Sequence, residues 1–150
     1  MIRPETRELV NRAVRQCLAV RLRLLNRVLS GLYDDALRSL GLRVGQFNLL
    51  MGVGAMGPVR PGALAEVLHM DKSTMSRDID RMCKQGWIAS SPAEGARGLA
   101  LTLTPAGENL LARAMPAWEL AQAQAAARLG PDAVVAVHAA AAGCGFPPSR

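Results

Sequence analysis

Residues 5–40 contain no proline and a single glycine, Gly31. Apolar side chains recur in this stretch close to the 3.6-residue period of a helix, at Val10, Val14, Cys17, Leu18, Leu24, Leu25, Val28, Leu32 and Ala36. We therefore expect one long helix, bent near Gly31 and ended by Gly41. A helix of that length is well above the average for globular proteins. Its apolar stripe needs a partner helix to cover it.

The composition agrees with a mainly helical protein. Half of the residues are hydrophobic, which excludes a disordered chain, and alanine and leucine predominate with 25 and 21 copies. A β-sandwich would need more β-branched and aromatic residues. The net charge of +6 suggests an anionic partner such as nucleic acid or a membrane surface. Because 16 of the 18 cations are arginine, GC-rich coding is an equally good explanation.

Several classes of protein are not indicated. The three cysteines form no CxxC pair, and His69 and His138 have no suitably spaced companions, so we expect neither a disulfide framework nor a metal site. Residues 1–8 lack the apolar core of a signal peptide, and no run of 18 apolar residues occurs. No catalytic or cofactor motif is present. We expect a cytoplasmic protein that is not an enzyme, has no cofactor and does not contact a membrane.

The rest of the chain predicts short helices, a hairpin and two further helices. Asp71 is a good N-cap and Gly86 a good stop for one helix, and Thr104-Pro105 opens another that should kink near Pro116. The expected elements are helices over 43–53, 61–68 and 72–85, strands over 87–90 and 99–104, helices over 105–129 and 131–142, and a flexible tail over 143–150. Three helices followed by a hairpin describe a winged helix-turn-helix. The fold class is therefore mainly α with a small β-hairpin (α+β).

The helix expected over 72–85 has two different faces. Met75, Ile79 and Met82 share one side, where they can contact the preceding helix. The other side is polar, and the first turns carry hydroxyl groups beside cations, at Lys72, Ser73, Thr74, Ser76 and Arg77. Small hydroxyls and a cation at a helix N-terminus suit contacts to phosphates and to base edges. Taken alone, the pattern favours an ordinary capped surface helix. The order of the elements favours DNA binding.

A set of short motifs follows in order along the chain: Gly41-Leu42, Gln46-Phe47-x-Leu49-Leu50, Leu64-Ala65-x-x-Leu68, Met70-Asp71-x-Ser73-Thr74-x-Ser76-Arg77, Gly86-Trp87-Ile88, Leu103-Thr104-Pro105-Ala106-Gly107 and Ala114-x-Pro116-x-Trp118. In this order the motifs resemble the MarR family of bacterial transcription regulators, and the resemblance covers residues 10–128.

The resemblance implies a homodimeric repressor that binds double-stranded DNA at a pseudo-palindromic operator. Residues 1–40 and 105–142 would form the dimerisation region, and residues 41–104 the DNA-binding winged domain. The helix over 72–85 would enter the major groove through Lys72, Ser73, Thr74, Ser76 and Arg77. Arg97 would reach the minor groove from the wing. The tip that carries Arg97 departs from the Asp- and Arg-rich tip that is usual in the family.

The resemblance also implies a small-molecule effector, often aromatic or acidic, bound where the dimer helices meet the winged domain. That location points to Arg21, Phe47, Met51, Met115 and Trp118, with Arg21 pairing with a carboxylate. The simpler interpretation is that the apolar residues among them belong to the core and that Arg21 is an exposed residue.

Two other functions remain open. Cys17 could act as a redox-sensing thiol, although the family's sensing position aligns with Ala19 and not with Cys17. A winged helix can also serve protein association without DNA. That alternative is motivated by the charge distribution, because residues 1–43 carry +5 whereas residues 44–104 carry only +1. A nearly neutral winged domain predicts weak non-specific affinity for DNA.

Overall fold

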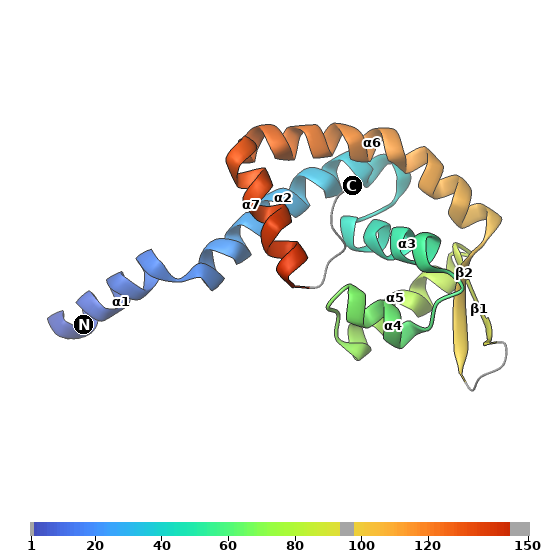
Figure 1. Cartoon of the computed structure of the whole chain (residues 1–150), viewed down its shortest axis with the longest axis horizontal. Coiled ribbons are helices and arrows are strands. Elements are labelled where there is room, and N and C mark those ends of the chain that lie inside the picture. Colours follow the sequence, from blue (N-terminus) through green and yellow to red (C-terminus); the bar gives the residue numbers. More distant parts are fainter. Residues whose placement is uncertain (1, 94–97, 145–150) are drawn as a thin grey trace.

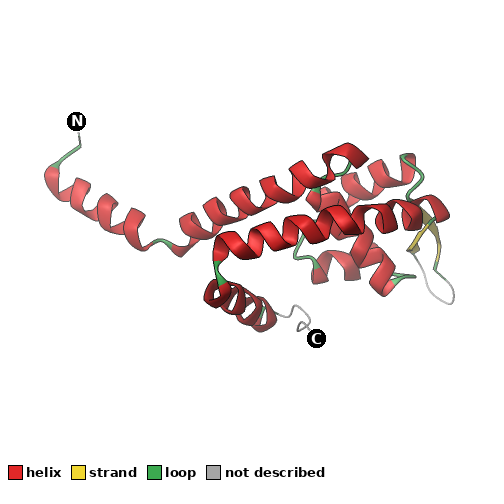
Figure 2. Ribbon diagram, turned by 90° about the horizontal axis from the view of Figure 1, so that it is seen from above, coloured by secondary structure: helices red, strands yellow, loops and turns green. Residues whose placement is uncertain are grey.

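The computed structural model describes residues 2–93 and 98–144 (Figures 1 and 2). Its elements are α1 (Pro4–Gln16), α2 (Leu18–Leu37), the 3-10 turn η1 (Arg38–Leu40), α3 (Val44–Met56), α4 (Pro61–Val67), α5 (Lys72–Lys84), β1 (Ile88–Pro92), β2 (Leu99–Leu103), α6 (Pro105–Leu129) and α7 (Pro131–Gly143). The predicted class is confirmed, because the described chain consists of helices and one antiparallel hairpin.

The N-terminal segment differs from the single helix that periodicity predicts. Cys17 adopts an extended conformation (φ −70°, ψ 107°), and it separates α1 from α2, while Gly31 lies inside α2. The guanidinium of Arg21 donates a hydrogen bond across this break to the carbonyl oxygen of Arg15, in the last turn of α1. A cationic side chain at a helix end satisfies a carbonyl that would otherwise have no partner. Periodicity cannot reveal the break, since neither proline nor glycine marks it.

The hairpin pairs β1 with β2 in the register Ile88 opposite Leu103 through Pro92 opposite Leu99. The chain before α4 joins the same sheet, because Val59 forms an isolated antiparallel bridge with Leu101. The wing is thereby attached to the helix-turn-helix by backbone hydrogen bonds as well as by side chains.

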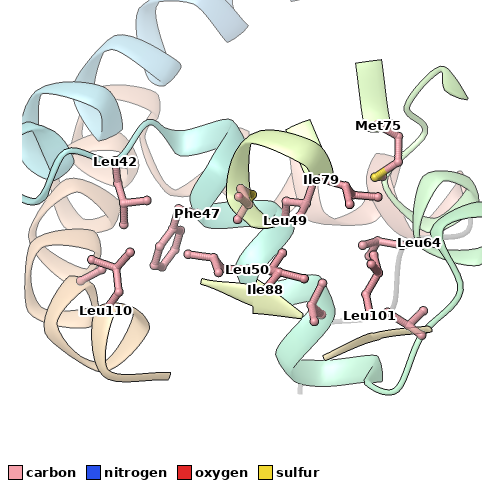
Figure 3. Packing of buried hydrophobic residues seen from close by; sticks show 14 of the residues in the cluster. Leu42, Phe47, Leu49, Leu50, Leu64, Met75, Ile79, Ile88, Leu101 and Leu110 are labelled. Carbon is pink, nitrogen blue, oxygen red and sulfur yellow. The ribbon is translucent and has the colours of Figure 1, made fainter. Parts of the chain in front are cut away.

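The buried side chains form one cluster around α3. Phe47, Leu49, Leu50 and Val53 of this helix are all 1 % exposed or less. Figure 3 shows Leu42 and Leu110 at one end of the cluster and Leu64, Met75 and Leu101 at the other. The helices α2 and α6, which lie side by side in Figure 2, cover one flank of α3, and the winged elements cover the other.

The start of α6 is fixed to the turn that follows α5. The Thr104 hydroxyl lies 2.5 Å from the carbonyl oxygen of Gly86 and 3.2 Å from that of Trp87, and it accepts a hydrogen bond from the Gly107 N–H (3.1 Å). Thr104 is therefore the N-cap of α6, as the sequence predicts. Gly107 has no room for a side chain, because a Cβ there would lie 2.0 Å from the carbonyl oxygen of Trp87.

The terminal helices carry apolar surface that nothing in the described chain covers. α6 runs through Pro116 without interruption and arches over the winged elements in Figure 1, whereas α1 extends away from them. Neither α1 nor α7 has a buried residue. The large apolar side chains left exposed on α1, α2, α6 and α7 are Leu9, Val10, Val14, Leu18, Val20, Leu22, Leu24, Val28, Leu120, Val135 and Val137.

Over the described residues, no helix combines the length and hydropathy needed to cross a membrane. The same residues contain no group of three or more His, Cys, Asp or Glu side chains arranged to hold a metal ion.

The Gly107 contact predicts that Gly107→Ala destabilises the protein. The added methyl group forces the first turn of α6 away from Trp87, and overpacking of this kind costs about 1–3 kcal/mol. Urea denaturation at fixed protein concentration measures the change in the free energy of unfolding. The matched control is Gly45→Ala in α3, where a Cβ meets nothing within 4 Å. That control should stabilise the helix by up to ~1 kcal/mol, so equal effects of the two substitutions would contradict the proposed clash.

Candidate nucleic-acid interface

The helix α5 begins with a compact hydrogen-bond network around Asp71. Its carboxylate accepts hydrogen bonds from the Ser73 hydroxyl (2.6 Å) and from the Thr74 N–H (2.9 Å). These donors hold the pKa of the Asp71 carboxyl well below its ordinary value, led by the Ser73 hydroxyl. Asp71 is the N-cap of α5, as the sequence predicts, and its carboxylate stays ionised around neutral pH.

Arg77 folds back onto the same turn. Its Nε donates to the carbonyl oxygen of Ser73 (3.2 Å), and a terminal nitrogen donates to the Thr74 hydroxyl (3.3 Å). The polar groups that the sequence assigns to DNA contact are therefore engaged with one another in the isolated chain. Lys72, Ser73, Ser76 and Arg77 are exposed and Thr74 is half-buried, so the first two turns of α5 offer one continuous polar surface.

The opposite face of α5 is buried, as predicted. Met75, Ile79 and Met82 are at most 8 % exposed and belong to the cluster around α3. The helix ends at Lys84, and Gly86 follows with the left-handed φ of 72° that favours glycine at this position. Packing on one face and a glycine stop at the end fix which side chains of α5 point outward.

A groove of about 480 Å³ runs between α4, α5 and the hairpin. Its lining is mostly apolar, and its polar side chains come from α5 and β1; the lining residues are Pro61, Gly62, Ala65, Lys72, Met75, Ser76, Ile79, Asp80, Cys83, Ser90, Leu99 and Leu101. The groove brings the predicted DNA-contact residues Lys72 and Ser76 next to the hairpin. Arg97, the predicted wing contact, lies outside the described residues.

Four of the five predicted effector residues pack together. Phe47 is fully buried, and its ring stacks on that of Trp118 with centroids 6.4 Å apart. Met51 and Met115 are partly buried against the same cluster. Arg21 is not among them, because it lies in the first turn of α2 and bonds the Arg15 carbonyl. The N-terminal end of α2 lies away from α3 in Figure 1.

The three cysteines are free thiols in different settings. Cys17 is half-exposed at the break between α1 and α2. Burial, with a smaller contribution from the Asp80 charge, raises the pKa of the Cys83 thiol, so Cys83 is a poor nucleophile at neutral pH. Cys144 is exposed after α7, where its carbonyl oxygen lies 3.0 Å from Nε2 of His69.

Sequence reasoning missed contacts between distant segments. His69, in the turn between α4 and α5, has a positive φ of 50° and contacts the end of α7, although its sequence marks only a turn. Tyr33 of α2 donates its hydroxyl hydrogen to the Gln122 side chain of α6, and burial raises the pKa of Tyr33. The bridge from Val59 to Leu101 also has no local signal, because the residues around Val59 are rich in glycine and proline.

Comparison with known proteins shows which family this winged region is similar to. Residues 40–98 match the model of the MarR family. The multiple antibiotic resistance protein MarR of Salmonella typhimurium is 31% identical over 85 residues, which are 56% of this chain and 59% of the relative. The chain thus spans about three-fifths of the length of the curated relatives it matches.

Solved structures show the same fold over most of the chain. The crystal structure of a probable transcriptional regulator from Pseudomonas aeruginosa has a TM-score of 0.76 at 25% identity, covering 86% of this chain and 97% of that one. A mutant of Escherichia coli MarR in complex with operator DNA also has a TM-score of 0.76, at 20% identity, covering 83% of this chain and 91% of that one. The family model matches residues 40–98 and the solved structures share the fold over most of the chain, so the chain is similar to the MarR family of winged helix-turn-helix transcriptional regulators.

Proposed function

We propose that the protein is a homodimeric DNA-binding repressor that acts in the cytoplasm on a pseudo-palindromic operator. The observation that carries this proposal is the outward polar surface of α5, whose first two turns present Lys72, Ser73, Ser76 and Arg77. A recognition helix enters the major groove with its N-terminal residues against the base edges. The structural neighbour in complex with operator DNA supports the same use of the fold.

The chemistry of α5 favours a few specific hydrogen bonds to DNA over non-specific electrostatic attraction to the phosphates. Asp78 and Asp80 offset half of the positive charge of the helix, which comes from Lys72, Arg77, Arg81 and Lys84. Residues 44–104 carry a net charge of only +1. Since non-specific affinity follows the number of phosphates neutralised, binding to random DNA should be weak. Discrimination then depends on hydrogen bonds from Arg77 and the hydroxyls to base edges.

A second copy of this chain is the proposed cover for the terminal helices. Leu18 and Leu22 of α2 are 73 % and 62 % exposed, and Val135 of α7 is 68 % exposed. Apolar surface of this extent marks an association surface in a water-soluble protein. Two copies related by a two-fold axis would bury the same stripes from both sides. The two α5 helices would then lie one DNA turn apart, about 34 Å.

Release by a small aromatic or acidic ligand is the proposed control. The site would lie where α2, α3 and α6 meet, around Phe47, Met51, Met115 and Trp118. These side chains support the idea through their chemistry, because aromatic and thioether groups suit an aromatic ligand. A ligand there would have to separate the stacked rings of Phe47 and Trp118, and it would thereby shift α3 relative to α6.

Arg77→Ala tests the proposed base contact. The operator is first obtained by selecting fragments of the source genome that the unaltered protein retains. If Arg77 contacts a guanine, the substitution weakens binding to that operator by about 1–3 kcal/mol and relaxes specificity at one position of each half-site. Fluorescence anisotropy titration measures the affinity. Arg128→Ala, an exposed arginine at the far end of α6, is the control and should bind as the unaltered protein does.

Leu22→Glu tests the proposed dimer. A carboxylate on the apolar stripe would be buried without a partner in the dimer, so the variant should become monomeric and lose operator binding. Sedimentation equilibrium measures the mass. Asn48→Glu adds the same charge at an exposed polar position of α3 and should remain dimeric. A dimeric Leu22→Glu variant would show that the interface lies elsewhere.

A further inference from the structure

Arg60 occupies the point where the helix-turn-helix meets the hairpin. It is exposed and directly precedes α4. Its neighbour Val59 is joined to Leu101 by two backbone hydrogen bonds, of 3.1 and 2.8 Å. This antiparallel bridge sets Arg60 beside Ala100, which pairs in turn with Ser91 of β1. Backbone pairing therefore fixes the position of Arg60 on the sheet.

A hollow of about 440 Å³ lies over this part of the sheet. Arg60, Ser91 and Thr102 supply its polar lining, and Pro58, Pro92, Ala93 and Ala100 supply the rest. Ala100 is small and leaves the space between the guanidinium and the hydroxyls open. A guanidinium and two hydroxyls can all donate hydrogen bonds, and the described residues of the lining include no carboxylate. This donor set suits the oxygen atoms of a phosphate.

The hollow and the groove beside α5 lie on opposite faces of the hairpin, because Ser91, Ala100 and Thr102 line the hollow whereas Ser90, Leu99 and Leu101 line the groove. The chain that leads into α4 connects the two. Pro61 and Gly62, which follow Arg60 directly, line the groove that also contains Lys72 and Ser76. In a bound helix-turn-helix the first helix crosses the DNA backbone while the second lies in the major groove. Here α4 is the first helix, and Arg60 stands at its start, on the side of the hairpin.

We propose that Arg60, with the hydroxyls of Ser91 and Thr102, binds a phosphate of the DNA backbone between the groove entered by α5 and the groove beside the hairpin. The inference rests on the proposed function, and it adds a contact that positions the winged domain without reading sequence. Among the described cations of residues 44–104, Arg60 alone lies outside α5. The ion pairs found in the described chain, Arg38–Asp35 and Arg43–Asp34, leave its guanidinium available.

The test is a salt titration of DNA binding by Arg60→Gln. The probes are the operator obtained by genomic selection and a mixed-sequence duplex of the same length, both followed by fluorescence anisotropy. Loss of one phosphate contact should weaken binding to both duplexes by a similar factor. It should also make the slope of log K against log salt shallower by about 1. Arg60→Lys should keep most of the slope. Arg128→Gln removes the same charge at the far end of α6, and it should leave the slope unchanged in protein that sedimentation equilibrium shows to be dimeric.

Four results would overturn the inference. An unchanged slope for Arg60→Gln, with the unaltered protein binding normally, would refute it and leave the proposed function standing. Weakened binding to the operator alone would make Arg60 a base contact. Thermal stabilisation of the DNA-free protein by inorganic phosphate, lost in Arg60→Gln, would assign the hollow to a free anion. If the unaltered protein binds no DNA, the proposed function fails first and this inference fails with it.

Discussion

The whole structure depends on the burial of α3. Phe47, Leu49, Leu50 and Val53 point to more than one side of this helix, so α3 is stable only when it is covered from several directions. The helices α2 and α6 cover one flank, and the winged elements cover the other. The cluster accordingly runs from Leu37 in α2 to Ala114 in α6. The segments proposed for dimerisation and for DNA contact therefore share one core, and a strain in either part reaches the other through α3.

Local chemistry explains which parts of the fold were predictable. Asp71 and Thr104 cap their helices through hydrogen bonds to residues three positions away, so their sequence neighbourhood contains the whole signal. The alternation over 99–104 likewise marks β2. The break at Cys17 has no such signal, because neither proline nor glycine marks it, although the Arg21 side chain of the following helix donates a hydrogen bond across it. Contacts such as Val59 with Leu101 depend on distant segments, and only the folded chain brings them together.

In the candidate site, too, the sequence predicted the features that depend on local pattern and missed the side-chain contacts. Helical periodicity was enough to divide α5 into a buried and an exposed face, and the structure places Met75 and Arg77 on those two faces. Periodicity could not show that Arg77 bonds the Ser73 carbonyl and the Thr74 hydroxyl in the isolated chain. Binding to a base would exchange those hydrogen bonds for others. The net gain from such a contact is therefore smaller than a count of its new hydrogen bonds suggests.

The attachment of α6 to the turn after α5 has a mechanical consequence. A helix of 25 residues is about 37 Å long. If it pivots by ~5° at the end that joins α7, its other end moves by ~3 Å, which is close to the ~3.4 Å rise of one base pair. Thr104 and Gly107 hold the N-terminal end of α6 tightly against the turn after α5, so α5 moves with that end of α6. In the proposed dimer, such a pivot of α6 would displace each recognition helix by nearly the rise of one base pair.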